Sequence, residues 1–217
     1  MSSAIARWPH LSSCGNESRP RDRYLGGEVS NRRNTSYLCM TPNEKEIHIW
    51  TIGHSTRSLN ELIELLKENK IDAIADVRSY PGSRKFPHFN AEALSLSLPD
   101  GGVEYIPFKQ LGGRRKARAD SPHTVWRNEA FRGYADYMDT DEFKKGIDDL
   151  IRLAADKSVS IMCSEAVWWR CHRSMISDYL KMEGVIVEHI MGPAKTELHP
   201  FTSAATTVDG KLFYGSV

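Results

Sequence analysis

The sequence predicts an α/β domain with a single, mainly parallel sheet and helices on both faces, in a Rossmann-like three-layer arrangement. Short β-prone runs alternate along the chain with segments whose apolar residues recur at helical spacing. This alternation implies right-handed crossovers between parallel strands. The 217 residues, 40% of them hydrophobic, are enough for one well-buried core, so a single domain is the expectation.

Five β-prone runs are the predicted strands of this sheet. They are Ile47–Ile52, Ile71–Val77, Val103–Phe108, Val159–Cys163 and Val185–Ile190. Each run is short and rich in aliphatic or aromatic residues, and each is followed by polar residues or by glycine. We therefore expect one parallel strand at each run.

Helices are predicted between these strands from capping residues and apolar periodicity. Ser58, with Glu61 three residues later, forms a capping box before an apolar stripe that begins at Leu59. Asn90 is expected to cap a short helix that ends by Pro99. Two further helices are expected to begin at Thr140 and after Cys171.

The two ends of the chain differ from the periodic part. Residues 1–44 are rich in Ser, Arg, Asn and Gly without periodicity, which predicts a disordered extension. Residues 45–192 form the predicted domain. Residues 193–217 are a C-terminal tail whose aromatic residues, Phe201 and Phe213-Tyr214, either dock on the domain or leave the segment mobile.

Charge and cysteine content exclude some classes of protein. Lys and Arg total 29 against 28 for Asp and Glu, so only a local patch would attract nucleic acid. Four cysteines do not form a secreted disulfide framework, and no apolar run approaches the roughly 20 residues that span a bilayer. We expect a cytoplasmic protein without a membrane partner; the sequence leaves its oligomeric state open.

Ionisable residues gather where predicted strands end. The segments are His54-Ser55, Asp76-Val77-Arg78, Cys163-Ser164-Glu165 and, at the start of the next helix, Cys171-His172-Arg173. In an open parallel sheet the carboxyl ends of the strands share one rim, where ligands usually bind. We therefore expect one polar site at this rim.

These segments resemble the family called domain of unknown function 488. The motifs that carry the resemblance are Thr51-Ile52-Gly53-His54-Ser55, Asp76-Val77-Arg78 with Pro81, Leu111-Gly112-Gly113, Phe131 to Tyr134, Cys163-Ser164-Glu165, Cys171-His172-Arg173 and Glu188-His189-Ile190. They cover nearly everything from Ile47 to Met191. Cys163-Ser164-Glu165 departs from the Cys-Ala-Glu of the family. The resemblance implies a fold and a site, but no substrate.

The leading interpretation of the rim is a site for a phosphorylated or otherwise anionic small molecule, such as a nucleotide. Arg78 and Arg173 are the candidate anion ligands, because guanidinium groups near a helix start bind phosphate and carboxylate well. Ser55 and His172 are further candidates. The alternative is structural: Arg78 and Arg173 form ion pairs with Asp76 and Glu165 and hold loops together without a ligand.

Three residues are candidates for catalysis: His54, Glu165 and Cys163. His54 and Glu165 would move protons, with Asp76 as a supporting residue, and Cys163 would act as a nucleophile if its pKa is lowered. Each of two of these residues also has a structural interpretation. Cys163 would be a small core residue, which we favour, and His54 would be a loop histidine hydrogen-bonded to Asp76.

The sequence leaves the cofactor open and assigns no metal site. Zinc would accept Cys163, Cys171, His172 and His54 as ligands. However, the neighbours Cys171 and His172 would point in different directions in a regular helix. The spacing of these residues is therefore not diagnostic.

A basic segment over residues 109–118 supports a second interpretation, a non-catalytic nucleic-acid-binding module. Its cations are Lys109, Arg114, Arg115, Lys116 and Arg118. Trp126, Trp168 and Trp169 would supply surfaces on which bases stack. The simpler alternative is a solvated loop with tryptophans packed over the core, and we favour it because charge runs commonly solvate loops.

Overall fold

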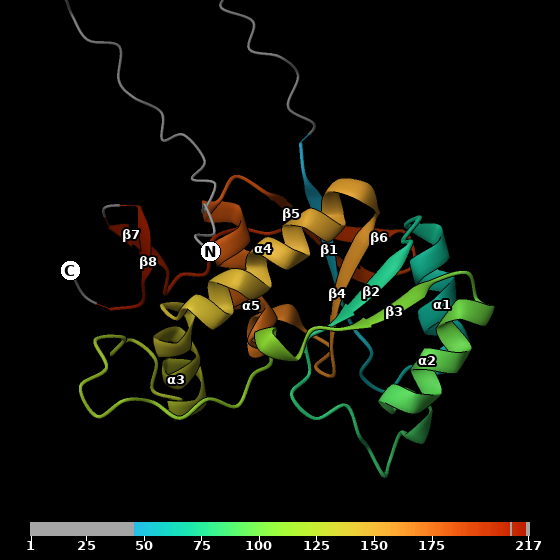
Figure 1. Ribbon diagram of the computed structural model, residues 1–217, viewed down its shortest axis with the longest axis horizontal. Coiled ribbons are helices and arrows are strands. Elements are labelled where there is room, and N and C mark those ends of the chain that lie inside the picture. Colours follow the sequence, from blue (N-terminus) through green and yellow to red (C-terminus); the bar gives the residue numbers. More distant parts are fainter. Residues whose placement is uncertain (1–45, 209, 216–217) are drawn as a thin grey trace, which may run out of the picture. The chain divides into compact units, whose positions relative to one another are not determined.

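The computed structural model describes residues 46–208 and 210–215 as a mixed α/β fold (Figure 1). Its main sheet has six strands in the order β3-β2-β4-β1-β5-β6. The strands are β1 (His48–Gly53), β2 (Ala73–Asp76), β3 (Glu104–Pro107), β4 (Val159–Cys163), β5 (Ile186–Gly192) and β6 (Lys195–Leu198). The described residues also form five α-helices: α1 (Leu59–Glu68), α2 (Ala91–Asp100), α3 (Glu129–Met138), α4 (Asp141–Asp156) and α5 (Arg173–Met182).

The five predicted strands are β1 to β5, and they pair with one another in parallel. The prediction of a mainly parallel α/β sheet is thus confirmed, and β4 has the predicted bounds. The sixth strand, β6, pairs antiparallel with β5 and comes from the segment expected to be a tail. The same segment adds a hairpin of β7 (Thr206–Val208) and β8 (Lys211–Phe213). The predicted disordered extension, residues 1–44, lies outside the described residues.

Helix starts follow the predicted caps with one change. The capping box of α1 is present: Glu61 N donates to Ser58 Oγ at 3.2 Å, and Ser58 N donates to Glu61 Oε2 at 2.6 Å. Thr140 Oγ1 caps α4. Asn90 precedes α2, but its side chain caps no helical N–H and instead accepts a hydrogen bond from Ser83 N.

Two hydrophobic clusters cover the sheet. In β2, Ala73 and Ala75 belong to one cluster and Ile74 to the other, because successive strand residues point to opposite faces. Helices α1 and α2 contribute to the cluster that contains Ile74. Helices α3, α4 and α5 contribute to the cluster that contains Ala73. The helix that follows β1, α1, therefore packs in one cluster, and the helix that follows the neighbouring strand β4, α5, packs in the other.

The C-terminal segment packs on the rest of the domain. Tyr214 is buried, and its hydroxyl donates to Asp178 Oδ2 at 3.0 Å. Phe201 stays largely exposed. Of the two alternatives for this segment, docking therefore holds for Tyr214. None of the helices that the structure describes has the length and apolar character needed to cross a membrane.

Candidate functional site

A cavity of about 620 Å³ lies at the carboxyl ends of β1, β2 and β4. The residues that follow these strands line it, together with residues from the basic segment and from α3. The lining side chains used below are His54, Ser55, Arg78, Tyr80, Arg114, Tyr134, Cys163, Glu165, Arg170, Cys171 and His172. Residues more than 100 positions apart in the chain therefore share one hollow, at the rim where the strand order predicts it.

The structure brings the sequence-predicted site residues together. His54, Ser55, Arg78, Cys163, Glu165 and His172 line the cavity. Asp76 lies directly behind it through its contact with Arg78. Arg173 is not a lining residue, although it touches the same loop. The expected ligands and the supporting aspartate thus occupy one rim, with Arg173 inside the wall.

Arg78 is held in place by Asp76. Its Nη2 lies 2.6 Å from Asp76 Oδ2 and its Nε lies 2.8 Å from Oδ1, a bidentate pair in which both side chains are buried. Tyr105 also donates its hydroxyl to Asp76 Oδ2 at 2.7 Å. The ion pair foreseen in the structural alternative is therefore present, and it fixes the guanidinium at the cavity wall.

His54 is locked between two neighbours rather than bonded to Asp76. Its Nδ1 lies 3.1 Å from Ser55 O, and its Nε2 lies 3.2 Å from Nη1 of Arg78. Because Arg78 can only donate, Nε2 is the acceptor and Nδ1 carries the proton. Burial, and then the charge of Arg78, lower the pKa of His54 to about 4. The imidazole is therefore neutral near pH 7 with its basic nitrogen already engaged.

Arg173 is buried without a carboxylate partner among the described residues. Its Nη2 donates to the backbone oxygen of Glu165 at 2.7 Å and its Nη1 donates to Thr51 Oγ1 at 3.3 Å. Its Nε is buried and finds no hydrogen-bond acceptor in the described part of the chain. A buried cation needs a nearby anion to offset its desolvation. The expected pairing with the Glu165 carboxylate is replaced by a contact with the Glu165 backbone.

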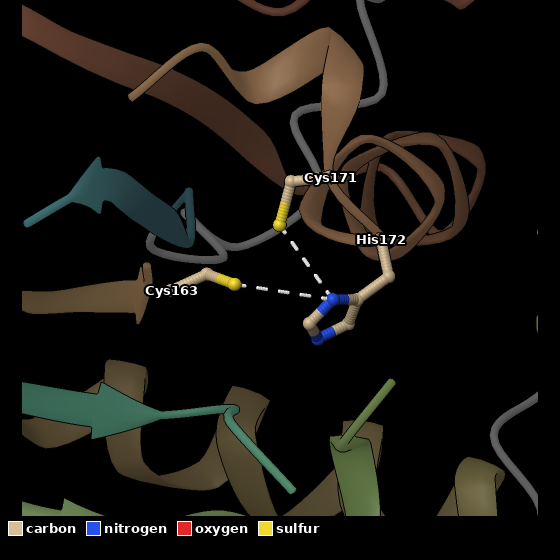
Figure 2. Close-up of side chains that lie close together, drawn as sticks. All are labelled: Cys163, Cys171 and His172. Carbon is tan, nitrogen blue, oxygen red and sulfur yellow. Dashed lines mark hydrogen bonds between the residues drawn. The ribbon is translucent and has the colours of Figure 1, made fainter. Parts of the chain in front are cut away.

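Cys163, Cys171 and His172 form a compact cluster on the wall of this cavity (Figure 2). Nδ1 of His172 lies 3.6 Å from Sγ of Cys171 and 4.0 Å from Sγ of Cys163. All three of these atoms lie within 4.8 Å of one another. Both cysteines are buried and free of disulfides.

The pKa values of the two thiols of the cluster are shifted in opposite directions. A hydrogen bond from Cys171 holds the pKa of Cys163 well below its usual range, with help from His172 and Arg173. Burial, and then the neighbouring Cys163, raise the pKa of Cys171 well above its usual range. Of the two thiols, Cys163 therefore loses its proton more readily. A thiolate at Cys163 would place negative charge near the buried Arg173.

The expectation that Cys171 and His172 diverge is wrong. Cys171 precedes α5 with an extended backbone, φ −133° and ψ 151°, so the geometry of a regular helix does not apply to it. His172 Nε2 lies 3.0 Å from the backbone oxygen of Val77. Nε2 must carry the proton to make this bond, which leaves the lone pair of Nδ1 facing the sulfurs.

The basic segment uses part of its charge within the domain. Arg115 lies 3.6 Å over the ring of Tyr137, and Arg118 forms ion pairs with Asp120 and Asp136. Arg114 lines the cavity, whereas Lys109 and Lys116 are exposed. Among the tryptophans, Trp168 is buried and stacks on His189, Trp126 is half-buried, and Trp169 is half exposed.

Sequence reasoning missed several lining residues. Arg170 and Tyr134 were assigned no role at the site, and Arg114 was placed only in the nucleic-acid interpretation. The run Arg170-Cys171-His172-Arg173 at a helix entry was the available signal for Arg170. Tyr134 lies in α3, a helix not predicted, whose N-cap Asn128 accepts a hydrogen bond from Ala130 N. An Asn before a helical pattern was the signal for that helix.

Comparison with known proteins identifies the family of this fold. The family model described as "Domain of unknown function DUF488" matches residues 58–180, more than half of the chain. This match includes Arg78, Cys163, Cys171 and His172, and leaves β1 with His54 outside. Neither the curated proteins nor the solved structures contain a significant match.

Proposed function

Because the chain belongs to the DUF488 family, as its resemblance implied, and that family description names no reaction, we propose a function from the cavity itself. The protein binds a phosphorylated or other anionic small molecule, such as a nucleotide, at the carboxyl ends of its parallel strands. The chemistry is carried by the cluster of Cys163, Cys171 and His172.

The charge of the lining residues is the observation that carries this proposal. Three arginines line the cavity, Arg78, Arg114 and Arg170, against one carboxylate, Glu165. Arg114 and Arg170 are exposed enough to move toward a ligand. Arg78 is already fixed by Asp76 and offers a preorganised guanidinium, so less side-chain entropy is lost on binding. A net positive, half-open cavity favours an anion.

The roles inside the cavity differ from the simplest acid–base scheme. His54 is poorly suited as a base, because its Nε2 accepts from Arg78. Glu165 is exposed on the cavity wall and remains the candidate proton carrier. Cys163, next to the buried Arg173, is the candidate reactive thiolate.

The nucleic-acid module has weaker support. Two cations of the basic segment, Arg115 and Arg118, already have partners in the domain, and Trp168 stacks on His189. Two broader expectations accompany the proposal. A Rossmann-like three-layer packing is supported by the two hydrophobic clusters, and a cytoplasmic location by two free buried thiols.

Thermal unfolding with defined anions tests the proposal. The full chain is heated with inorganic phosphate, with adenosine monophosphate and with glucose 6-phosphate. A ligand at a hundred times its Kd stabilises by about 2.7 kcal/mol, a rise in Tm of about 5–10 °C. R170Q should remove most of the rise given by the anion that binds. R152Q is the matched control, because Arg152 is an exposed arginine on α4 outside the cavity.

Two results would count against the proposal. One is that none of the three anions raises the Tm of the wild type. The other is a rise in Tm that is as large in R170Q and in R152Q as in the wild type. A short single-stranded oligonucleotide in the same assay separates the nucleic-acid alternative, whose affinity would depend on Lys109 and Lys116 and fall with salt.

A further inference from the structure

The three side chains of the cluster have the arrangement of an open metal site. A zinc ion with Zn–S bonds of about 2.3 Å and Zn–N bonds of about 2.0 Å holds tetrahedral sulfur and nitrogen ligands about 3.6 Å apart. The distances from His172 Nδ1 to Cys171 Sγ and Cys163 Sγ are 3.6 Å and 4.0 Å. These two distances therefore match, or come close to, the ligand spacing of a tetrahedral zinc site.

The imidazole of His172 is oriented as metal-binding histidines usually are. Such a ring donates the N–H of its other nitrogen to a carboxylate or a backbone oxygen, which fixes the tautomer. Here Nε2 donates to Val77 O at 3.0 Å, and Nδ1 faces both sulfurs (Figure 2). The basic nitrogen therefore points at the position that a metal would occupy.

We propose that Cys163, Cys171 and His172 bind one zinc ion, with the fourth coordination position open to the cavity. All three residues line that cavity, so the remaining position faces the space of about 620 Å³. Three protein ligands with one open position are typical of catalytic rather than structural zinc sites. Two sulfurs and one imidazole favour zinc over magnesium or calcium, which prefer oxygen.

The charge of the cluster suits this role. Both cysteines bind a metal as thiolates, so any proton that they carry passes to solvent when the metal binds, and both sulfurs then donate electron pairs to the ion. The two thiolates neutralise a divalent ion. The buried charge of Arg173 beside them is then left over, which favours an anion at the open position. In this respect the inference deepens the proposed anion binding, whereas metal binding itself does not depend on it. With zinc bound, Cys163 is a ligand and not a free nucleophile.

Metal titration of the reduced full chain tests the site. After chelator treatment, Co²⁺ should bind once per chain and give thiolate-to-metal charge-transfer absorption, which Zn²⁺ abolishes by displacement. C163S, C171S and H172Q should each weaken zinc binding by at least roughly a hundredfold. The C14S/C39S double variant is the matched control: it removes the two other cysteines of the chain and should bind as the wild type does.

X-ray absorption at the zinc edge of the wild type covers the case in which a variant does not fold. The expected ligand shell holds two sulfurs with nitrogen or oxygen at the other positions. A shell without sulfur, or four sulfurs, would overturn the inference. So would a reduced wild type that binds no zinc, or zinc binding that C163S and C171S keep.

Phosphate binding, measured with and without zinc, separates this inference from the proposed function. Zinc binding that depends on the three ligands, without any anion binding, supports the metal site and overturns the anion proposal. If phosphate binding depends on Arg170 and the chain takes up no zinc, the anion proposal is supported and the metal site is overturned. R152Q, which lies outside the cavity, should leave zinc affinity within about twofold.

Discussion

Gly53 occupies a position, at the end of β1, where the backbone of the site passes too close for any side chain. A Cβ on Gly53 would lie 1.8 Å from the backbone oxygen of Glu165 and 2.9 Å from Nη2 of Arg173. The absence of a side chain therefore lets the loop after β4 close over Arg173. The same loop carries Glu165 into the cavity wall.

We expect G53A to destabilise the protein by about 3 kcal/mol or more, because the overlap is with a backbone atom that cannot rotate away. Equilibrium unfolding in urea measures the loss. G192A is the matched control: Gly192 ends β5, and a Cβ there meets nothing within 4 Å. Its effect should stay within about 0.5 kcal/mol. Equal stability of the two variants would contradict the close approach at Gly53.

Single residues were predicted well where their role is local and poorly where it depends on a distant partner. The bidentate pairing of Arg78 with Asp76 joins residues two positions apart, and the sequence offered an ion pair between them as the structural alternative to anion binding. Arg173 instead contacts Thr51, 122 positions away in the chain. No local pattern indicates that contact, because the fold of the whole sheet creates it.

Helix α1 shows how far local signals reach at the scale of an element. Its capping box satisfies backbone N–H groups at both Ser58 and Glu61, and these two residues suffice to predict the start of the helix. Asn90 has the same potential at α2, yet its side chain accepts from Ser83 N instead. A capping residue can therefore mark a helix start while its side chain stabilises the preceding loop.

S58A should destabilise the protein by about 1 kcal/mol, because Glu61 N loses its acceptor at the helix start. The loss is read from the midpoint of urea unfolding. S95A makes the same substitution at an exposed position inside α2, where alanine is the better helix former, so it should be neutral or slightly stabilising. If S95A were as destabilising as S58A, the loss could not be assigned to the cap.

A chain of buried hydrogen bonds connects the site with the C-terminal segment of the molecule. Thr51 accepts from Arg173 and lies 2.7 Å from His189 Nδ1. His189 Nε2 lies 2.9 Å from His199 Nδ1, and His199 Nε2 lies 3.1 Å from Asp178 Oδ1. The carboxylate requires a donor, so His199 Nε2 carries a proton and donates it to Asp178 Oδ1. The segment beyond residue 192 thereby supports the wall behind the cluster.

We expect the free energy of unfolding to fall in acid because His189 is held neutral in the folded chain. Burial, and then the charges of His199 and Arg173, lower the pKa of His189 to about 2 in the folded chain, whereas an unfolded histidine titrates at about 6.5. Between these values the unfolded chain binds the extra proton. The neutral His189 therefore contributes fully to the free energy of unfolding above the pKa of the unfolded chain. This contribution is lost by about 1.4 kcal/mol per pH unit as the pH falls toward the pKa of the folded chain.

H189Q should therefore flatten the pH dependence of the free energy of unfolding between about pH 6.5 and about pH 5. Urea unfolding at several pH values measures the slope. Wild type and variant compared at about pH 8, where the unfolded histidine is neutral, give the cost of the lost contacts separately. Parallel slopes for the two proteins would show that His189 takes up a proton without unfolding.

The amino-acid sequence alone was enough to predict the alternation of strands and helices, the mainly parallel sheet, the rim at which polar residues gather and the family. These follow from periodicity, capping and motif order, which are properties of neighbouring residues. Only the folded domain shows that Arg173 lies inside the wall, that Cys171 and His172 converge on Cys163, and that the C-terminal segment reaches Asp178. These positions depend on the direction in which the backbone enters a helix and on contacts between distant segments. The packing of the whole domain determines both the direction and the contacts.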